Sequence, residues 1–543
     1  MHMPAALRRN DAPNLAPVRG DVSPAEAGPS GLLRFITCGS VDDGKSTFIG
    51  RLLYDCQLIL DDQMESLTKD SKRHGTQNDD HDFALLVDGL AAEREQGITI
   101  DVAYRYFATK RRSFIVADTP GHEQYTRNMA TGASTADLAV ILLDARNGAT
   151  AQTKRHAFIV SMLGIRHVVL AVNKMDLVGY SQQRFEELAN EFRALAGKLG
   201  FASVVPIPIS AKLGDNISSP SAAMPWYRGP SLLDHLETVD VEDNATDDAF
   251  RFPVQWVSRP NSDFRGYSGF VASGRVTPGT AVTIQPSGVR SAVKDIWLAE
   301  KSLDEAVVGQ SVTITLEDNV DVSRGDVIVT QAQAATVTRH ARAHLLWMSQ
   351  APLATGASYF VKIATKTTAA TVSAVRHTVN VFDYSEVEAR GVGINDLAAV
   401  TVDFDVPLAL TRYRDNRELG GFILIDRLTN ETVALGLIEE PLATGEAASF
   451  SAHNPESHTL VANVAHWLSQ AREKPLRSIA KAITWRTTGS LDTFVLSYIF
   501  TGSAKISAAI SVSEILTKLI LYYVHERVWA RSKFGLPRIP DTK

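Results

Sequence analysis

Eight residues, from Gly39 to Ser46, have the composition and spacing of a phosphate-binding loop. They read Gly-Ser-Val-Asp-Asp-Gly-Lys-Ser, and the apolar run Leu32 to Cys38 before them predicts a buried strand. Thr47 to Leu53 after them predicts a helix, which supplies the strand, loop and helix that this motif requires. Glycines at both ends let the backbone turn its N–H groups toward phosphate oxygens. The loop therefore restricts this part of the chain to an α/β nucleotide-binding fold.

The loop residues are expected to share the contacts to a bound nucleotide. Lys45 would supply a positive charge for the β- and γ-phosphates, and Ser46 a hydroxyl ligand for Mg²⁺. The predicted nucleotide-binding residues of the loop are Gly39, Ser40, Val41, Asp42, Asp43, Gly44, Lys45, Ser46 and Thr47.

Two further segments resemble the switches of translation-factor GTPases. Glu93 to Ile100 resembles the first switch, in which Thr99 would reach Mg²⁺ and respond to the γ-phosphate. Asp118-Thr119-Pro120-Gly121-His122 follows the apolar run Phe114 to Ala117 and resembles the second switch. Asp118 would hold Mg²⁺ through water, the Gly121 amide would bond the γ-phosphate, and His122 would orient the attacking water. The predicted metal set is Ser46, Thr99 and Asp118, and the predicted catalytic set is His122, Lys45, Thr99 and Gly121.

The choice of base is predicted from Asn173-Lys174-Met175-Asp176, which follows the apolar run Val168 to Val172. A carboxylate at Asp176 can accept from the ring N–H and the exocyclic amine of guanine, and adenine offers no such pair of donors. Lys174 would lie along the plane of the base. Ser210-Ala211-Lys212, after the predicted strand Val204 to Ile209, resembles the remaining guanine loop. The expected cofactors are GTP and Mg²⁺.

Length and composition indicate several domains. A chain of 543 residues with 45% hydrophobic content is too long for one core. The net charge of −6 gives no general attraction to nucleic acid, and no nucleic-acid partner is expected. Two cysteines, Cys38 and Cys56, are too few for a disulfide framework and are interpreted as packing residues in a reducing compartment.

The pattern of elements divides the chain into six segments. Residues 1–30 are predicted to be a disordered tail, and 31–241 an α/β P-loop domain with a mostly parallel, doubly wound sheet that includes a helix from Phe185 to Leu199. Short alternating strands, such as Gly269 to Val276, Ala281 to Ile284 and Ser311 to Leu316, then predict two small β-barrels. The barrels are placed at 250–333 and 336–440, a polar linker at 441–474 and an α-helical hairpin at 475–535.

Several motifs make the chain similar to one family in particular. Elongation factors carry histidines in the phosphate loop where this chain has Ser40 and Asp43. Gly-Ser-Val-Asp-Asp-Gly-Lys-Ser-Thr is found in the large, GTP-hydrolysing subunit of bacterial sulfate adenylyltransferase, which this chain resembles over much of 33–438. Further matching motifs are Asp88-Gly89-Leu90, Met224-Pro225-Trp226-Tyr227, Arg259-Pro260-Asn261, Asp263-Phe264-Arg265-Gly266-Tyr267 and Gly420-Gly421-Phe422-Ile423.

The resemblance implies a function in sulfate assimilation. A small partner subunit would bind ATP and sulfate and form adenosine 5′-phosphosulfate, and this chain would drive that uphill reaction by hydrolysing GTP as part of a heterodimer. The alternative is a translation-factor-like GTPase that delivers a charged tRNA and uses its barrels to hold RNA. Ser40, Asp43, the Met224 to Tyr227 motif and the acidic net charge favour the first.

The C-terminal segment resembles a small family of predicted two-helix membrane proteins. Its helices are expected at Thr487 to Thr501 and Ile506 to Val524, with basic residues outside both ends, so that residues 487–524 would form a membrane hairpin with both ends in the cytoplasm. The first run is short for a span, and Glu514 and Lys518 each oppose insertion of the second by roughly 2.5–3.5 kcal/mol. A soluble hairpin that dimerises through its apolar face is the alternative. The expected location is the cytoplasm, with attachment to the inner membrane if the hairpin inserts.

Overall fold

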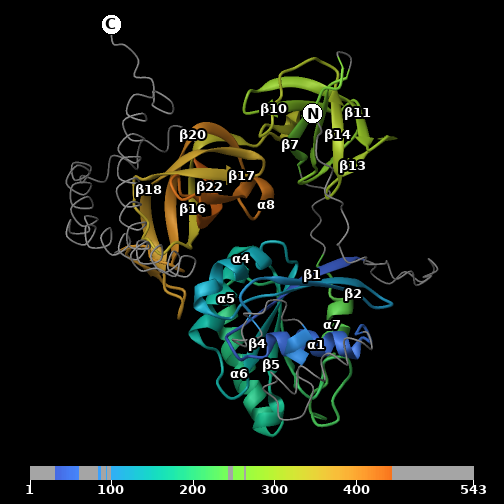
Figure 1. Cartoon of the computed structure of the whole chain (residues 1–543), viewed down its shortest axis with the longest axis vertical. Coiled ribbons are helices and arrows are strands. Elements are labelled where there is room, and N and C mark those ends of the chain that lie inside the picture. The colour runs from blue at the N-terminus through green and yellow to red at the C-terminus, as the bar shows by residue number, and fades with distance from the viewer. Residues whose placement is uncertain are drawn as a thin grey trace, which may run out of the picture. The chain divides into compact units, whose positions relative to one another are not determined.

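The structure is a computed structural model that describes residues 31–59, 83–86, 93, 99–241, 249–261, 264–389 and 391–442 (Figure 1). The expected tail at 1–30 and hairpin at 475–535 lie outside the described residues, as do all but the first two residues of the linker at 441–474. Of the segment predicted to be the first switch, Glu93, Thr99 and Ile100 are described.

A six-stranded sheet forms the N-terminal domain, in the order β2-β3-β1-β4-β5-β6. Strand β1 pairs in parallel with β3 and β4, and β5 pairs in parallel with β4 and β6. Strand β2 is an antiparallel edge strand beside β3. The prediction of a mostly parallel sheet is therefore confirmed. The strands are β1 (Leu32–Cys38), β2 (Ala103–Ala108), β3 (Ser113–Asp118), β4 (Leu138–Asp144), β5 (His167–Asn173) and β6 (Ser203–Pro208).

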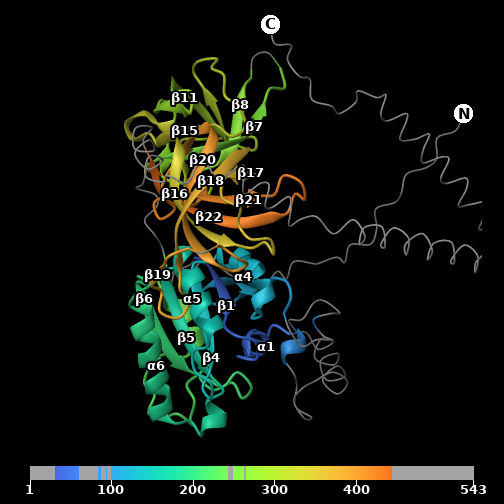
Figure 2. The same cartoon turned by 90° about the vertical axis from the view of Figure 1, so that its left-hand side faces the viewer.

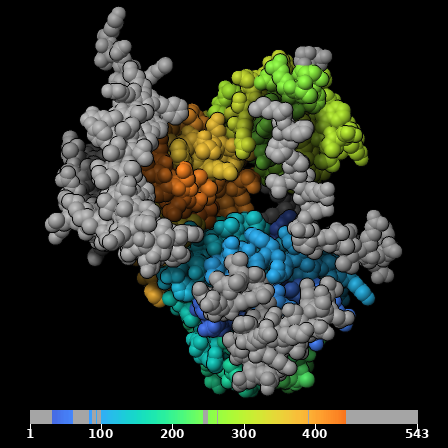
Figure 3. All heavy atoms as spheres, viewed as in Figure 1, coloured from blue at the N-terminus to red at the C-terminus, as the bar shows by residue number. Residues whose placement is uncertain are grey.

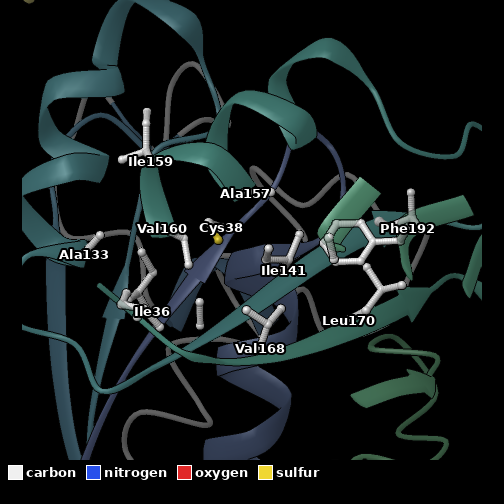
Figure 4. Packing of buried hydrophobic residues seen from close by; sticks show 14 of the residues in the cluster. Ile36, Cys38, Ala133, Ile141, Ala157, Ile159, Val160, Val168, Leu170 and Phe192 are labelled. Carbon is white, nitrogen blue, oxygen red and sulfur yellow. The ribbon is translucent and has the colours of Figure 1, made fainter. Parts of the chain in front are cut away.

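Helices cover both faces of this sheet, as a doubly wound fold requires (Figures 1 and 2). Apolar residues of α4, α5 and α6 pack on one face, and those of α1 and α7 on the other. Figure 4 shows the first cluster, in which Ile36 of β1 and Ile141 of β4 lie among Val160 of α5 and Phe192 of α6. The helices are α1 (Lys45–Asp55), α4 (Thr126–Ala133), α5 (Ala151–Met162), α6 (Gln182–Ala196) and α7 (Leu232–Thr238).

Burial on both faces explains why the central strands are continuous apolar runs. Every residue of β4, Leu138–Asp144, is buried. Removing one large apolar side chain from water contributes about 1.5–3 kcal/mol, so this layer is a main source of the domain's stability. Truncating Phe192, which has no exposed surface, would cost about 3–5 kcal/mol.

Local signals account for the helix boundaries. The helix predicted from Phe185 to Leu199 begins earlier, at Gln182, because the hydroxyl of Ser181 accepts the backbone N–H of Arg184 and caps it. It ends at Ala196, three residues before the predicted end. Helix α1 begins at Lys45, two residues before the predicted start, because Gly44 adopts a left-handed φ of 87° and turns the chain directly into the helix.

Two closed antiparallel sheets follow, and they confirm the predicted β-barrels. The first has the order β10-β15-β7-β8-β14-β11-β12, and pairing of β10 with β11 closes it. The segment Gly269 to Val276, predicted as one strand, contains the end of β8 and the separate β9. The strands of this sheet are β7 (Arg251–Ser258), β8 (Gly266–Phe270), β10 (Ala281–Gln285), β11 (Val289–Leu298), β12 (Lys301–Leu303), β14 (Ser311–Leu316) and β15 (Val327–Thr330). Strands β9 (Arg275–Val276) and β13 (Ala306–Val307) pair with each other in a separate two-stranded sheet.

The second barrel has the order β17-β21-β22-β16-β20-β18-β19, closed by pairing of β17 with β18. In each barrel, inward-facing apolar side chains form a core. Figure 3 shows the outer surfaces of the two barrels, the first in green to yellow and the second in yellow to orange. The elements of the second barrel are β16 (Thr336–Trp347), β17 (Ser358–Ile363), β18 (Lys366–Val379), β19 (Glu386–Val387), β20 (Leu397–Leu410), the short helix α8 (Arg417–Gly420), β21 (Gly421–Ile425) and β22 (Thr432–Leu442).

Among the described residues, we find no helix with the length and apolar character needed to cross a membrane.

Candidate functional site

The predicted phosphate loop connects β1 to α1 at the carboxyl edge of the sheet. Its backbone takes left-handed φ values at Asp42 (66°) and Gly44 (87°). A Cβ atom on Gly44 would stand 2.6 Å from the Asn173 side-chain nitrogen, so the loop packs directly against the predicted guanine motif. The loop curls around its own lysine, because Lys45 Nζ donates to the carbonyl oxygens of Ser40 (2.7 Å) and Gly39 (3.5 Å).

Two buried charged residues, Lys45 and Asp118, lie next to the phosphate loop. Lys45 is only 6% exposed, and burial lowers its pKa, against the opposing effect of Asp118 and Asp43. Burial raises the pKa of Asp118, against the opposing effect of its hydrogen bond from Ser46 and the charge of Lys45. The site thus holds a buried cation and a buried carboxylate next to each other, which is an arrangement suited to a phosphate and a metal ion.

The structure brings the three predicted metal-binding residues together. Ser46 Oγ donates to Asp118 Oδ2 at 2.8 Å and lies 3.2 Å from Thr99 Oγ1. Thr37, which the motifs did not include, donates to the other carboxylate oxygen, Asp118 Oδ1, at 3.0 Å. Two hydroxyls and one carboxylate are hard oxygen donors, and this is the donor set that fits Mg²⁺.

The predicted second switch approaches this cluster through its backbone. A Cβ atom on Gly121 would lie 2.5 Å from Lys45 Nζ and 2.7 Å from the Ser40 carbonyl carbon, so only glycine allows so close an approach. His122 is exposed, and its Nδ1 accepts the Gln124 backbone N–H at 3.2 Å. No hydrogen bond joins the His122 ring to Lys45 or Ser46 in the part of the chain that the structure describes. The histidine therefore stands near the end of the switch but is turned to cap the turn that follows.

The predicted guanine-binding residues also come together. Asn173 Nδ2 donates to the Asp43 carbonyl oxygen (2.8 Å), and Asn173 Oδ1 accepts the Ala211 backbone N–H (2.9 Å). Ser210 Oγ donates to Asp176 Oδ1 at 2.7 Å. Lys174 Nζ donates to the Asp42 carbonyl oxygen. These bonds connect three loops that are more than thirty residues apart in the sequence.

Besides Thr37, two further buried residues of the site were not found from the sequence. His156 of α5 has no exposed surface, and its Nδ1 accepts the Gly39 backbone N–H at 3.1 Å. Burial, followed by the charge of Lys45, lowers its pKa to about 3, so the ring is neutral. Asp144 ends β4 beside Asn173, which ends β5. A polar residue closing the apolar run Leu138 to Leu143 was a usable signal for Asp144, whereas nothing in the sequence of α5 distinguishes His156.

Three family models match separate parts of the chain. Residues 30–243 match the elongation factor Tu GTP binding domain, and residues 340–439 match a GTP-eEF1A C-terminal domain-like model. Residues 479–530 match a predicted membrane protein family, DUF2061, and lie outside the described residues. With the loop, the Asp118 switch and the Asn-Lys-Met-Asp motif on a parallel sheet, the first match defines the class: a GTP-binding protein with an elongation-factor-like fold.

Curated relatives define the family within that class. Sulfate adenylyltransferase subunit 1 of Methylorubrum extorquens is 55% identical over 417 residues, which cover 77% of this chain and 89% of that protein. The bifunctional enzyme NodQ of Rhizobium sp. (strain N33) is 52% identical over 442 residues, 81% of this chain and 68% of that protein. The chain belongs to the sulfate adenylyltransferase subunit 1 family. A crystal structure of sup35 complexed with GDP aligns with a TM-score of 0.36 at 22% identity, over 79% of this chain and 98% of that one.

Proposed function

We propose that this chain is the GTP-hydrolysing subunit of a sulfate adenylyltransferase, which couples GTP hydrolysis to formation of adenosine 5′-phosphosulfate from ATP and sulfate on a small partner subunit. The observation that carries the proposal is the 55% identity to sulfate adenylyltransferase subunit 1 over 89% of that protein. A name that specifies a subunit supports the existence of a partner, and the assembled loop, switch and guanine residues support the role of the nucleotide.

The phosphate side of the site would bind and orient the reacting groups. Lys45 and the loop amides would hold the β- and γ-phosphates, and Ser46, Thr99 and Asp118 would hold Mg²⁺, which supplies charge stabilisation when bound. The close approach of Gly121 to Lys45 would let the switch backbone reach the γ-phosphate. Phosphoryl transfer depends mainly on positioning, so His122 would act by orienting water after its ring turns from the cap at Gln124 toward the phosphate.

The base side would select guanine. One oxygen of Asp176 is already held by the Ser210 hydroxyl, so the carboxylate is oriented before the base arrives. It would accept from the ring N–H and the exocyclic amine, and the Ala211 loop, fixed by Asn173, would offer a backbone N–H to the base oxygen. This half-buried carboxylate would face no donor if adenine bound, and the unmatched acceptor disfavours ATP.

Coupling would operate through the switches. Joining sulfate to AMP makes a mixed anhydride, and the reaction requires a second source of free energy. In the GTP form, contacts to the γ-phosphate and Mg²⁺ would order the segments around Thr99 and His122 into a surface that the partner prefers. Moving a partner from mostly inactive to mostly active requires a difference in affinity of roughly 5.5 kcal/mol between the two states.

Delivery of a charged tRNA is the second candidate. The elongation factor Tu GTP binding domain and the two barrels are compatible with it. The family membership and the net charge of −6 favour sulfate activation. Copurification distinguishes the two, because the first requires a small ATP-binding protein and the second requires bound RNA.

A GTP turnover assay tests the proposal. Phosphate release from GTP is measured for the full-length chain alone, with the coexpressed small subunit, and with that subunit plus ATP and sulfate. We expect turnover to rise when the partner and both of its substrates are present, because coupled turnover needs the partner's reaction. Equal rates under all three conditions would contradict coupling.

We also propose that residues 487–524 attach the chain to the inner membrane from the cytoplasmic side. The match of residues 479–530 to a predicted membrane protein family supports this. Cell fractionation followed by extraction at alkaline pH is the test: the full-length chain should stay with the membrane and a chain ending at residue 474 should not. Recovery of the intact chain wholly in the soluble fraction would favour the soluble, dimerising hairpin.

A further inference from the structure

Asp144 belongs to none of the nucleotide-binding motifs, yet it lies between two of them. It is the last residue of β4, is 1% exposed, and stands in register with Asn173 at the end of β5. Lys174 follows Asn173 directly in the sequence and takes a left-handed φ of 62°. Parallel strands end at the same edge of a sheet, so the Asp144 carboxylate and the Lys174 side chain occupy the same edge.

The carboxylate of Asp144 is held on two sides. Lys174 Nζ lies 3.0 Å from Oδ2, and Arg146 donates through Nη2 to Oδ2 (2.7 Å) and through Nε (3.1 Å) and its backbone N–H (2.9 Å) to Oδ1. Burial opposes ionisation, but the hydrogen bonds from Arg146 and Lys174 outweigh it and lower the pKa of Asp144 to about 2. Asp144 is therefore a carboxylate at neutral pH.

The backbone of Asp144 reaches the phosphate loop as well. The carboxylate of Asp43 accepts the Ser40 backbone N–H at 2.6 Å, and the nearby backbone N–H of Asp144 opposes the rise in the pKa of Asp43 that burial causes. Lys174 meets the same loop from the other side, at the carbonyl oxygen of Asp42. Lys174 therefore contacts both the Asp144 carboxylate and the backbone of the phosphate loop.

We propose that Asp144 is a positioning residue for the nucleotide: it fixes Lys174 along the guanine plane and ties the base side of the site to the phosphate loop. The inference rests on the GTP binding proposed above. A lysine side chain has four rotatable bonds, and its stem presents a defined surface to the base only if its ammonium is held. Two oxygens, from Asp144 and Asp42, hold it here before the base arrives, which lowers the entropy lost on binding.

The dissociation rate of methylanthraniloyl-GDP tests this role. The full-length wild-type chain and Asp144→Asn are loaded with the fluorescent nucleotide and chased with excess GDP. The variant keeps the shape of the side chain and loses its charge. We expect dissociation to become about 10-fold faster, because a hydrogen bond to a charged group is lost, while kcat at saturating GTP stays within about twofold. The matched control is Asp137→Asn, which precedes the first residue of the same strand. The Asp137 carboxylate accepts the Arg34 backbone N–H there, and its replacement should not affect dissociation.

A double-variant comparison separates positioning from general stability. Lys174→Met keeps an apolar stem and removes the ammonium through which Asp144 would act. If the account is correct, Asp144→Asn adds less than about twofold in the Lys174→Met chain, since the two changes remove the same contact. A full 10-fold acceleration in that background would overturn it. Thermal melting of each variant verifies that the compared chains are folded.

A milder variant covers the case in which Asp144→Asn does not fold. Arg146 is half exposed and supports the same carboxylate, so Arg146→Gln should accelerate dissociation by about two- to threefold. If the wild-type chain binds the nucleotide and every folded variant releases it at the wild-type rate, the role of Asp144 is overturned but the proposed GTP site is not. A wild-type chain that fails to retain the fluorescent nucleotide would instead overturn the proposed GTP site, and the positioning role with it.

Discussion

The phosphate side and the guanine side of the site are built from similar polar residues but are stabilised differently. On the guanine side, Asn173 and Lys174 donate to loop carbonyl oxygens, and Ser210 holds Asp176. On the phosphate side, burial shifts the pKa of Asp118 upward and that of Lys45 downward. Internal hydrogen bonds hold both sides, but on the phosphate side opposite charges are also kept buried, at a cost that phosphates and a metal ion would reduce.

This difference indicates a division of labour between recognition and response. A side that is already hydrogen-bonded can recognise its ligand with little rearrangement and so determines affinity and base selectivity. A side whose charges are stabilised by the ligand responds to whether the γ-phosphate is present, which a switch requires. Changes on the phosphate side should therefore alter turnover and metal dependence, and changes on the guanine side should alter affinity and base choice.

Replacing His122 should have the largest effect on turnover. We expect His122→Ala to lower single-turnover GTP hydrolysis by about 10²-fold or more through loss of water positioning, while fluorescent GTP binding stays within about threefold. Rapid quench and equilibrium titration measure the two quantities. If binding and turnover fell together, His122 would contribute to nucleotide affinity, and the proposed difference between the phosphate side and the guanine side would be contradicted.

Replacing Asp176 should affect the base side alone. Asp176→Asn replaces an acceptor with an amide, so GTP affinity should fall about 30-fold and affinity for xanthosine triphosphate, which offers an oxygen in place of the exocyclic amine, should rise. Competition titrations with both nucleotides provide the measurement. Dependence on Mg²⁺ should match the wild type; a shifted dependence would show that the two sides are not separate.

Replacing Ser46 should affect the metal and leave base choice unchanged. Ser46→Ala removes a hydroxyl that lies within hydrogen-bonding distance of both Asp118 and Thr99. We expect the Mg²⁺ concentration for half-maximal turnover to rise about 10-fold, with the preference for GTP over ATP intact. A titration with Mg²⁺ at fixed GTP measures the first, and a result in which only base preference changes would contradict the assignment.

The smallest expected effect is the contribution of His156 to acid stability. Its pKa is about 3 in the folded chain, below the ordinary value near 6.5, so between these values the unfolded chain binds a proton that the folded chain does not. The contribution of the neutral His156 ring to the free energy of unfolding is therefore fully present above pH 6.5. It falls by up to about 1.4 kcal/mol for each pH unit below that value. Denaturant titrations between pH 7 and 5 should show a flatter dependence in His156→Gln than in the wild type. Equal slopes would show that His156 is not held neutral.

Much of the phosphate side could be predicted from sequence because it depends on contiguous residues. Gly39 to Ser46 specify their own loop, and the buried runs of β1, β3 and β5 place the loop, Asp118 and Asn173 at one edge. The contacts of Thr37, Asp144 and His156 depend on sheet order and helix packing, which a local pattern does not encode. The direction of the His122 side chain could not be predicted from the sequence either. It depends on the hydrogen bond that the Gln124 backbone N–H donates to His122 Nδ1 in this conformation.

Boundary errors followed the same principle. The sequence placed the strand at Ser311 to Leu316 correctly because its alternation is strong, and β14 spans those residues. The pattern predicts one strand from Gly269 to Val276, yet β8 ends at Phe270 and β9 begins at Arg275. Ser273, which lies between β8 and β9, pairs with Arg251 in an isolated bridge. The chain therefore leaves the sheet after β8 to make a tertiary contact that the sequence periodicity does not reveal.

The central claim, that GTP hydrolysis on this chain drives sulfate activation on a partner, is tested most directly by adenosine 5′-phosphosulfate synthesis. The full-length chain with its small subunit is supplied with ATP and sulfate under three conditions: with GTP, without GTP, and with GTP but the Lys45→Ala variant. The account predicts substantial product only in the first condition, because Lys45 is the buried cation of the phosphate loop. Product formed at the same rate in all three would contradict it.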